Sequence, residues 1–443
     1  MKKLLLPLLI LLSFGKTYSQ QWFVTRVADA PMSISNNAVV EGWANDTGYV
    51  YSFGGIDSTK IWSGITKKSF RYNTVTDVWD TIPDLPNTNA VIASGASYVD
   101  SIIYIMGGYQ VLSNGSEISS NIVNRFDPRT NTYLSDGANI PVAIDDHVQV
   151  VWNDSLIYLI TGWSNTTNVP NVQIYDPTND NWLTGTSVPN NNTYKVFGAS
   201  GGILDNQIVY HGGASTGINF PAQSNLRIGQ INPSNPTQIT WSVYSQNPNY
   251  KTYRSACAVV TQAWVPTMNW LGGSDVSYNY NGIAYNGSGG VEPQNRNLWT
   301  GGAGGPLDSF QVFGATLPMD LRGIAGPFGI LDSDFYIVGG METNQQVSKK
   351  TLLLQHTGIF SIDENEMNKF NLFPNPALEQ VNLVFEEIEK RTIRLFDILG
   401  NEVFKAESDQ LSHQLDVTQY SKGIYLIKVQ TDKGSSSQKI VVQ

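Results

Sequence analysis

Six short polar segments in the first three quarters of the chain hold the side chains best suited to bind a ligand. Each stands about sixteen to eighteen residues before a glycine-containing doublet. Arginine can hold a carboxylate with two hydrogen bonds, and tyrosine rings pack on sugar rings. The set therefore predicts a polar site for an anionic or hydroxyl-rich ligand. The candidate residues are Asn37, Asn89, Asp145, Asp146, His147, Tyr194, Lys195, Tyr253, Arg254 and Arg322.

Two of these groups have a second interpretation. His147 is suited to act as a general base beside Asp145 or Asp146, because imidazole titrates near neutrality, but a histidine in a polar loop is often incidental. Arg254 and Arg322 can bind a ligand or serve the fold. Cys257 is expected to be a buried, inert thiol. The four histidines show no metal-ligand spacing, so no metal or other cofactor is expected.

The elements that must position these residues are short strands ending at the doublets. The apolar run before each doublet and the polar turn before most of these runs predict hairpins, and glycine permits close backbone approach. The doublets recur roughly every fifty to seventy residues. They are Gly54-Gly55, Gly107-Gly108, Thr161-Gly162, Gly212-Gly213, Gly272-Gly273 and Gly339-Gly340.

A second phrase follows three of the doublets, at residues 72–79, 126–133 and 175–182. An aromatic residue, turn residues and a second aromatic residue predict a hairpin whose ends pack between neighbouring sheets. With the doublets, this pattern resembles the kelch repeat over residues 21–357. The resemblance implies an all-β, six-bladed propeller whose innermost strands line a central channel.

The first segment of the mature chain is expected to complete this propeller. Only one strand, Lys350–Gln355, follows the last doublet, while Trp22 and Pro31 have no strand partner of their own. We therefore expect Gln21–Arg26 to form the outer strand of the sixth blade. Such closure leaves no exposed sheet edge within the propeller.

The two ends of the chain indicate export. Lys2 and Lys3, an apolar run and small residues at 17–19 predict a signal peptide at residues 1–19, ahead of a propeller at 20–357. No segment is long enough to span a membrane. The chain of 443 residues has a net charge of −10 and no basic tract, so a nucleic-acid partner is not expected. We expect a monomer.

After a linker at 358–370, residues 371–443 show alternating apolar positions that predict a small Ig-like β-sandwich. The landmarks resemble the type A C-terminal sorting domain of the type IX secretion system; an ordinary immunoglobulin-like module is the alternative. The resemblance implies recognition by that machinery in a Gram-negative bacterium, and release or attachment to surface lipopolysaccharide. The landmarks are Pro374, Asn375, Pro376, Asp397, Gly400, Gly423, Tyr425 and Lys439.

Three functions remain open at this point. The first is a secreted or cell-surface propeller that binds a glycan or a protein, and we favour it over an enzyme. The second is a sugar mutarotase or isomerase, since the architecture and charge are similar to those of bacterial sialic-acid mutarotases. There, Asp145, Asp146 or His147 would move protons while Arg254 or Arg322 holds a carboxylate. The third is a purely structural surface component.

Overall fold

The computed structural model describes residues 21–261, 266–302, 304–329, 332–357, 370–385, 387–397, 401–431 and 434–442. The chain divides into two compact units, residues 1–359 and 360–443. The described residues form an all-β fold, with two short 3-10 turns, η1 (Trp62–Gly64) and η2 (Thr343–Gln345), as the helical elements. The expected signal peptide lies outside the described residues.

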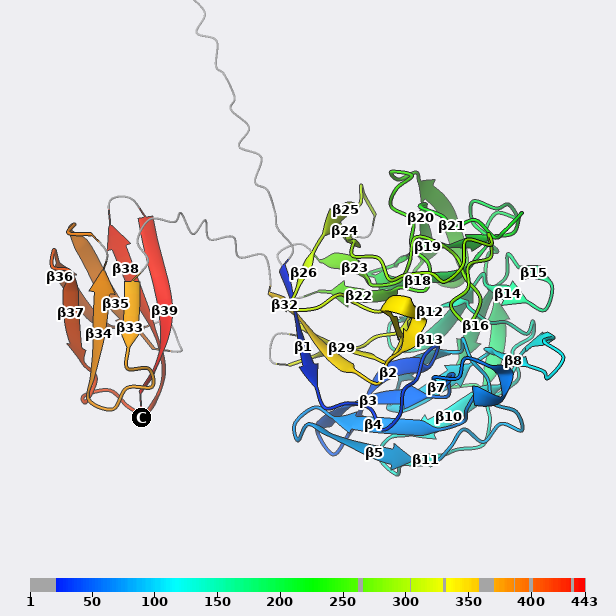
Figure 1. The fold of residues 1–443 in the computed structure, drawn as a ribbon, viewed down its shortest axis with the longest axis horizontal. Coiled ribbons are helices and arrows are strands. Elements are labelled where there is room, and N and C mark those ends of the chain that lie inside the picture. The colour runs from blue at the N-terminus through cyan, green and yellow to red at the C-terminus, as the bar shows by residue number, and fades with distance from the viewer. Residues whose placement is uncertain are drawn as a thin grey trace, which may run out of the picture. The chain divides into compact units, whose positions relative to one another are not determined.

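The described residues of the first unit form six larger sheets, here numbered 1 to 6, each built on four antiparallel strands. In Figure 1 the colour passes from blue to yellow from sheet to sheet. Apolar side chains fill the space between neighbours, such as Tyr51 of sheet 1 against Ile103 of sheet 2. Sheet 1 has β2 (Ala38–Ala44), β3 (Thr47–Phe53), β4 (Ser69–Asn73) and β5 (Val78–Ile82); sheet 2 has β6 (Gly95–Val99), β7 (Ile102–Met106), β10 (Val123–Asp127) and β11 (Thr132–Tyr133); sheet 3 has β12 (Val148–Trp152), β13 (Leu156–Ile160), β16 (Val172–Asp176) and β17 (Asn181–Thr184). Sheet 4 has β18 (Val196–Leu204), β19 (Gln207–Ser215), β20 (Leu226–Asn232) and β21 (Asn235–Tyr244); sheet 5 has β22 (Ala256–Val260), β23 (Thr267–Leu271), β24 (Asn297–Gly301) and β25 (Asp308–Phe310); sheet 6 has β28 (Ala325–Phe328), β29 (Asp334–Val338), β32 (Thr351–Thr357) and β1 (Gln21–Val27).

Shorter strands extend or connect these sheets. Two of them add parallel edges, β27 (Arg322–Gly323) beside β2 and β26 (Val312–Phe313) beside β1. The small hairpins are β8 (Tyr109–Val111) with β9 (Glu117–Ser119), β14 (Trp163–Ser164) with β15 (Thr167–Asn168), and β30 (Met341–Glu342) with β31 (Gln346–Val347).

The second unit has two antiparallel sheets that share one apolar core, in which Leu383 of one sheet packs with Ile393 and Ile427 of the other. Alternating burial along β34 matches the alternation seen in the sequence. The first sheet has β33 (Phe370–Phe373), β34 (Gln380–Phe385) and β37 (Ser412–Asp416). The second has β36 (Glu402–Ser408), β35 (Arg391–Phe396), β38 (Gly423–Thr431) and β39 (Gly434–Val442).

The leading strand β1 pairs with the last strand of the first unit. All seven of its residues pair antiparallel with β32, from Gln21 opposite Thr357 to Val27 opposite Thr351. This is the pairing expected for the segment Gln21–Arg26. The indole of Trp22 is fully buried, so the strand contributes to the core as well as to the backbone ladder.

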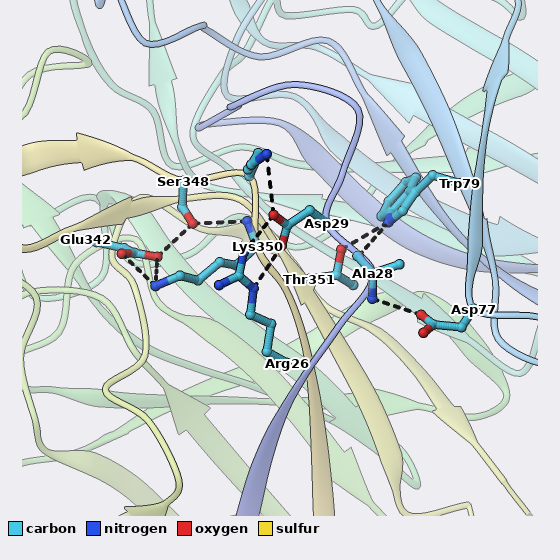
Figure 2. Close-up of polar contacts among 10 residues, drawn as sticks. Arg26, Ala28, Asp29, Asp77, Trp79, Glu342, Ser348, Lys350 and Thr351 are labelled. Atoms are coloured by element: carbon cyan, nitrogen blue, oxygen red, sulfur yellow. Dashed lines mark hydrogen bonds and ion pairs between the residues drawn. The ribbon is translucent and has the colours of Figure 1, made fainter.

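The chain just after β1 is tied to sheet 1 (Figure 2). The Ala28 N–H donates to Asp77 Oδ1 at 2.8 Å, and Trp79 Nε1 donates to the Ala28 carbonyl at 3.0 Å. The same indole nitrogen lies 3.1 Å from Thr351 Oγ1 of β32. One tryptophan therefore contacts the residue that follows β1 and the first residue of β32.

Ion pairs at the same place contribute less. Asp29 binds Arg26 at 2.6 Å and Lys349 at 3.5 Å, and Lys350 binds Glu342 at 2.8 Å. The three cationic side chains are 39–57% exposed and the two carboxylates are partly exposed, and such surface pairs stabilise a fold by only about 0–1 kcal/mol. The backbone ladder and the buried indole of Trp22 therefore dominate the attachment of β1.

The same interlock recurs between sheets 2 and 3, which explains the aromatic phrase in the sequence. The Ala138 N–H donates to Asp180 Oδ1 at 2.7 Å, and Trp182 Nε1 donates to the Ala138 carbonyl at 2.8 Å. The hydroxyl of Tyr175 also donates to Asp180. The phrase thus supplies a carboxylate and an indole that bind the segment connecting the preceding sheet to their own sheet.

The glycine doublets bring the backbones of neighbouring sheets into direct contact. Gly108 N–H donates to the Ile144 carbonyl at 2.9 Å, and a Cβ on Gly107 would lie 2.3 Å from that oxygen. Gly340 and Gly339 stand in the same relation to Ile34. Neither of the first glycines can therefore carry a side chain without moving the next sheet.

Gly107→Ala should destabilise the first unit more than Gly115→Ala does. Both glycines have a left-handed backbone, which costs a non-glycine residue about 1–2 kcal/mol. A Cβ on Gly115 meets nothing within 4 Å, whereas one on Gly107 meets Ile144. Urea unfolding of the two variants measures the difference. Equal losses would mean that the doublet serves only the backbone conformation.

Candidate functional site

Near the start of the first strand of each sheet in the first unit, one residue has a left-handed backbone, with φ between 47° and 68°. Five of the six precede that strand, and Gly198 is the third residue of β18. Starting from Asn36, whose N–H donates to the Asp320 carbonyl at 3.3 Å, a hydrogen bond joins each residue to its counterpart in the preceding sheet. In sheet 6 it is Leu321 N–H that donates to Arg254. Six backbone bonds thus connect all six sheets. This left-handed set is Asn36, Ala93, Asp146, Gly198, Arg254 and Asp320.

Three members of the left-handed set form a buried ion cluster. Arg254 Nε and Nη2 donate to the two oxygens of Asp146 at 3.2 and 2.6 Å, and Nη1 donates to Asp320 Oδ1 at 2.8 Å. Each of the three is at most 2% exposed. The rings of Tyr253 and Tyr278 flank the guanidinium at 5.2 and 5.6 Å. The three charges must pair with one another, because a buried charge without a partner would not be solvated by water and would strongly destabilise the fold.

Arg322 adds a second cation to the cluster. Its Nη2 donates to the His147 carbonyl at 2.9 Å, and Nη1 lies 3.5 Å from Asp146 Oδ1. Its Nε is buried without a partner among the described residues. Both arginines are therefore occupied by the protein itself. In Arg254, every side-chain nitrogen is directed at an internal carboxylate, which leaves it poorly placed to hold a ligand carboxylate.

On one side of the cluster, a channel of about 280 Å³ runs between the first strands of the six sheets. His147 Nε2 lies 3.1 Å from Gln149 Oε1, and Gln149 Nε2 donates to Ser97, so His147 Nε2 carries the hydrogen. Its Nδ1 is then an acceptor with no partner among the described residues. Burial and the nearby Arg322 lower the pKa of His147 to about 4, so the ring is neutral at neutral pH.

Glu41 of β2 lines the same channel. The Gly326 N–H donates to its Oε2 at 3.2 Å, and burial raises the pKa of the carboxyl to about 7. The folded protein therefore holds a proton here at pH values where the unfolded chain has lost it.

Glu41→Gln should reduce the loss of stability that accompanies a rise in pH from about 4.5 to 7. In this window the folded wild type binds more protons at Glu41 than the unfolded chain does, so its stability falls as the pH rises. Glutamine has no such penalty, and the variant should gain about 1–3 kcal/mol over the wild type by pH 8. Denaturant unfolding of both proteins across this pH range tests the prediction. Any contribution of His147 is the same in both proteins, so parallel curves of stability against pH would refute the role of Glu41.

On the other side of the cluster lies a second cavity of about 250 Å³, here called the mouth pocket. Asp145, Asp146 and Arg254 form its polar base, while its walls come from segments that follow the doublets and from Phe197 of β18. Tyr109 and Trp163 directly follow their doublets, and Trp163 pairs with Asp145 in an isolated bridge. The remaining lining residues are Glu117, Phe197, Phe220, Asn279 and Tyr285.

The sequence candidates separate into two groups. Asp145, Asp146, His147, Arg254 and Arg322 gather at the ion cluster and the two cavities. The others line neither cavity. Asn37 is buried and donates to Ser52 and Val338, Asn89 is exposed, Tyr194 and Lys195 are partly exposed, and Tyr253 is buried under Arg254.

The candidates were located by counting about seventeen residues back from each doublet, and this fixed distance explains why some of them lie away from the cavities. The hairpin Gly95–Met106 of sheet 2 is shorter than the hairpin Ala38–Phe53 of sheet 1. The same distance back from the doublet therefore gives Asn89 instead of the left-handed residue Ala93. In sheet 6 the same distance gives Arg322 instead of the left-handed residue Asp320. The wall aromatics were missed altogether, although an aromatic residue directly after a doublet, as at Tyr109 and Trp163, could have indicated them.

The landmarks of the second unit mostly serve its fold. Asn375 Nδ2 donates to the Lys439 carbonyl at 2.7 Å, and the Val441 N–H donates to Asn375 Oδ1, which fixes the Pro374–Pro376 segment to β39. Asp397 accepts hydrogen bonds from Asn401. The Tyr425 hydroxyl bonds to the Ser421 carbonyl, and Gly423 begins β38. Gly400 lies outside the described residues.

Among the described residues, no group of three or more histidine, cysteine, aspartate or glutamate side chains is arranged to hold a metal ion. Cys257 lines the channel, and burial raises the pKa of its thiol. The described part of the chain also contains no helix that is long and apolar enough to cross a membrane.

Two curated proteins resemble parts of the chain. An endo-acting ulvan lyase of Formosa agariphila is 29% identical over 111 residues, 24% of this chain and 21% of that protein. The kelch-like protein terF of Aspergillus terreus is 26% identical over 168 residues, 37% of this chain and 35% of that protein. The chain thus spans between a fifth and about a third of the length of these relatives.

The fold resembles the solved structure of YjhT, with a TM-score of 0.56 and 13% identity, over 75% of this chain and 99% of that one. A propeller-like, all-β architecture agrees with this likeness. Residues 371–443 match the family described as the secretion system C-terminal sorting domain. Those residues are therefore a sorting domain of the type IX secretion system, and the protein is exported to the cell surface or the extracellular space.

Proposed function

We propose that the six sheets are the blades of a closed, six-bladed, kelch-type propeller at residues 20–357. Support comes from the backbone bonds that link the left-handed set and from the pairing of β1 with β32. In this proposal, residues 1–19 are the signal peptide and residues 358–370 connect the propeller to the sorting domain.

We propose further that the exported propeller is a binding module for a glycan, held in the mouth pocket. The observation that carries this is a cavity of sugar size whose aromatic walls stand over carboxylates and the Asn279 amide. Aromatic faces pack against the apolar faces of sugar rings, and carboxylate and amide groups bind the hydroxyls. A role as an enzyme is less well supported, because Asp146 and Arg254 are engaged with each other.

A glycan array probed with the full mature protein tests the binding proposal. Trp163→Ala removes a pocket wall and should reduce binding about tenfold or more. Trp62→Ala is the matched control, since Trp62 is 47% exposed and lines neither cavity. Equal binding by both variants would place the glycan elsewhere, and no binding to any glycan would refute the proposed function.

A further inference from the structure

The charges around the mouth pocket do not balance. Arg254 pairs with Asp146 and Asp320, and Arg322 approaches Asp146. Asp145 and Glu117, which also line the pocket, have no cationic partner among the described residues. The two cations are therefore used within the cluster, and the pocket itself presents uncompensated carboxylates.

Asp145 is the more constrained of the two carboxylates. It is 3% exposed, and its Oδ2 accepts a hydrogen bond from Ser119 Oγ at 2.6 Å. Its Oδ1 has no hydrogen-bond partner among the described residues. Asp145 Oδ1 is not among the fully buried, unpaired side-chain atoms of the described residues, so it is accessible from the pocket that Asp145 lines. The structure thus leaves one acceptor facing the cavity that only a ligand or solvent can satisfy.

Aromatic rings surround this acceptor. Trp163 lies 5.5 Å from Phe197 and 5.6 Å from Phe220, and Tyr285 lies 4.9 Å from Phe220, measured between ring centroids. The negative faces of such rings attract cations, and clustered aromatic side chains are the usual means of binding alkylated ammonium groups. The walls and the base of the pocket therefore favour the same kind of ligand group.

We propose that the mouth pocket binds a protonated or quaternary ammonium group, held between the Asp145 carboxylate and the aromatic walls. The inference rests on the proposed binding function and narrows its ligand to a glycan that carries an amine. It also reverses the sequence expectation of an anionic ligand, because the arginines that suggested one are neutralised inside the protein.

The proposal has a definite pH dependence. Burial, the neighbouring Asp146 and Glu117 raise the pKa of Asp145 well above its usual range, while Ser119 and Arg254 act in the opposite direction. An ammonium group entering the pocket favours the ionised carboxylate. Binding should therefore release a proton, and affinity should increase with pH until Asp145 is ionised in the empty pocket.

Titration calorimetry of the full mature protein tests this with two matched pairs of probes. Glucosamine is compared with glucose, and choline with the uncharged alcohol in which carbon replaces its nitrogen. The charged member should bind about tenfold more tightly. Asp145→Asn should abolish that preference, and Glu117→Gln, a change at the exposed rim, should weaken it. Asp205→Asn, in an exposed turn, should preserve it.

The outcomes separate this inference from the proposed function. Equal affinity within each pair, with glycan binding still lost in Trp163→Ala, would overturn the ammonium site and leave the glycan module standing. A preference for the charged probe that survives both Asp145→Asn and Glu117→Gln would also overturn it. If neither the probes nor the glycan array show binding, both proposals fall. Proton release measured in buffers of different ionisation enthalpy supports the role of Asp145.

Discussion

Deletion of residues 21–31 should unfold the first unit as a whole rather than loosen one sheet. The deletion removes β1 from β32 and the Ala28 contacts to Asp77 and Trp79. It also empties the space filled by Trp22, whose ring lies between 4.9 and 6.5 Å from those of Phe310, Phe335 and His356. Loss of a buried tryptophan alone costs about 3–5 kcal/mol, which is a large part of the stability of a domain.

Near-ultraviolet circular dichroism and proteolysis of the truncated protein measure this loss. A synthetic peptide of residues 21–31, added in trans, should restore the signal, whereas the same peptide with Trp22→Ala should not. Removal of residues 371–443, a separate compact unit, is the control and should leave the unfolding midpoint of the first unit unchanged. Cooperative unfolding at the wild-type midpoint after the deletion would contradict the structural role of β1.

Arg254→Met should cost the first unit about 3–5 kcal/mol, because it leaves Asp146 and Asp320 buried without their shared cation. The penalty should shrink as the pH falls. Burial already raises the pKa of Asp320, and Arg254 opposes that rise. Without Arg254, the folded variant should hold the Asp320 proton more tightly than the unfolded chain does, so the stability of the variant is greatest at low pH and is lost as the pH rises.

Arg129→Met provides the comparison. Arg129 also pairs with an aspartate, Asp127, but its side chain is 55% exposed, so its removal should change stability far less than the removal of Arg254 does. Denaturant unfolding of both variants from pH 4 to 8 is the measurement. A loss for Arg254→Met that is small, or that does not vary with pH, would show that water reaches the two carboxylates.

The repeat could be predicted from the sequence because the contacts between sheets require particular residue types. Gly107 and Gly108 are glycines since the backbone of the next sheet lies against them, and Asp180 and Trp182 are retained as a pair since both bind Ala138. Such requirements are local, and they recur in several of the sheets. In the sequence they appear as the regular spacing of the glycine doublets and as the recurring pair of aromatic residues around a turn.

The site was harder to predict because its residues depend on variable parts of each repeat. Asp320 and the channel residue Glu41 carry no signal of their own. The burial of Asp320 and the place of Glu41 in the channel follow from the arrangement of all six sheets. The walls at Phe220 and Tyr285 come from loops of unequal length that share no pattern. Arg254 was identified as a candidate residue, but its two carboxylate partners become apparent only when sheets 3 and 6 are brought together.

The pairing of β1 with β32 also sets the order of events during synthesis. Residues 21–27 leave the ribosome first, and their partner strand at 351–357 follows only after every intervening sheet has been made. Contacts between segments so distant in sequence form late. The indole of Trp22 therefore stays without its native neighbours Phe310, Phe335 and His356 for most of the time that the ribosome takes to translate the chain.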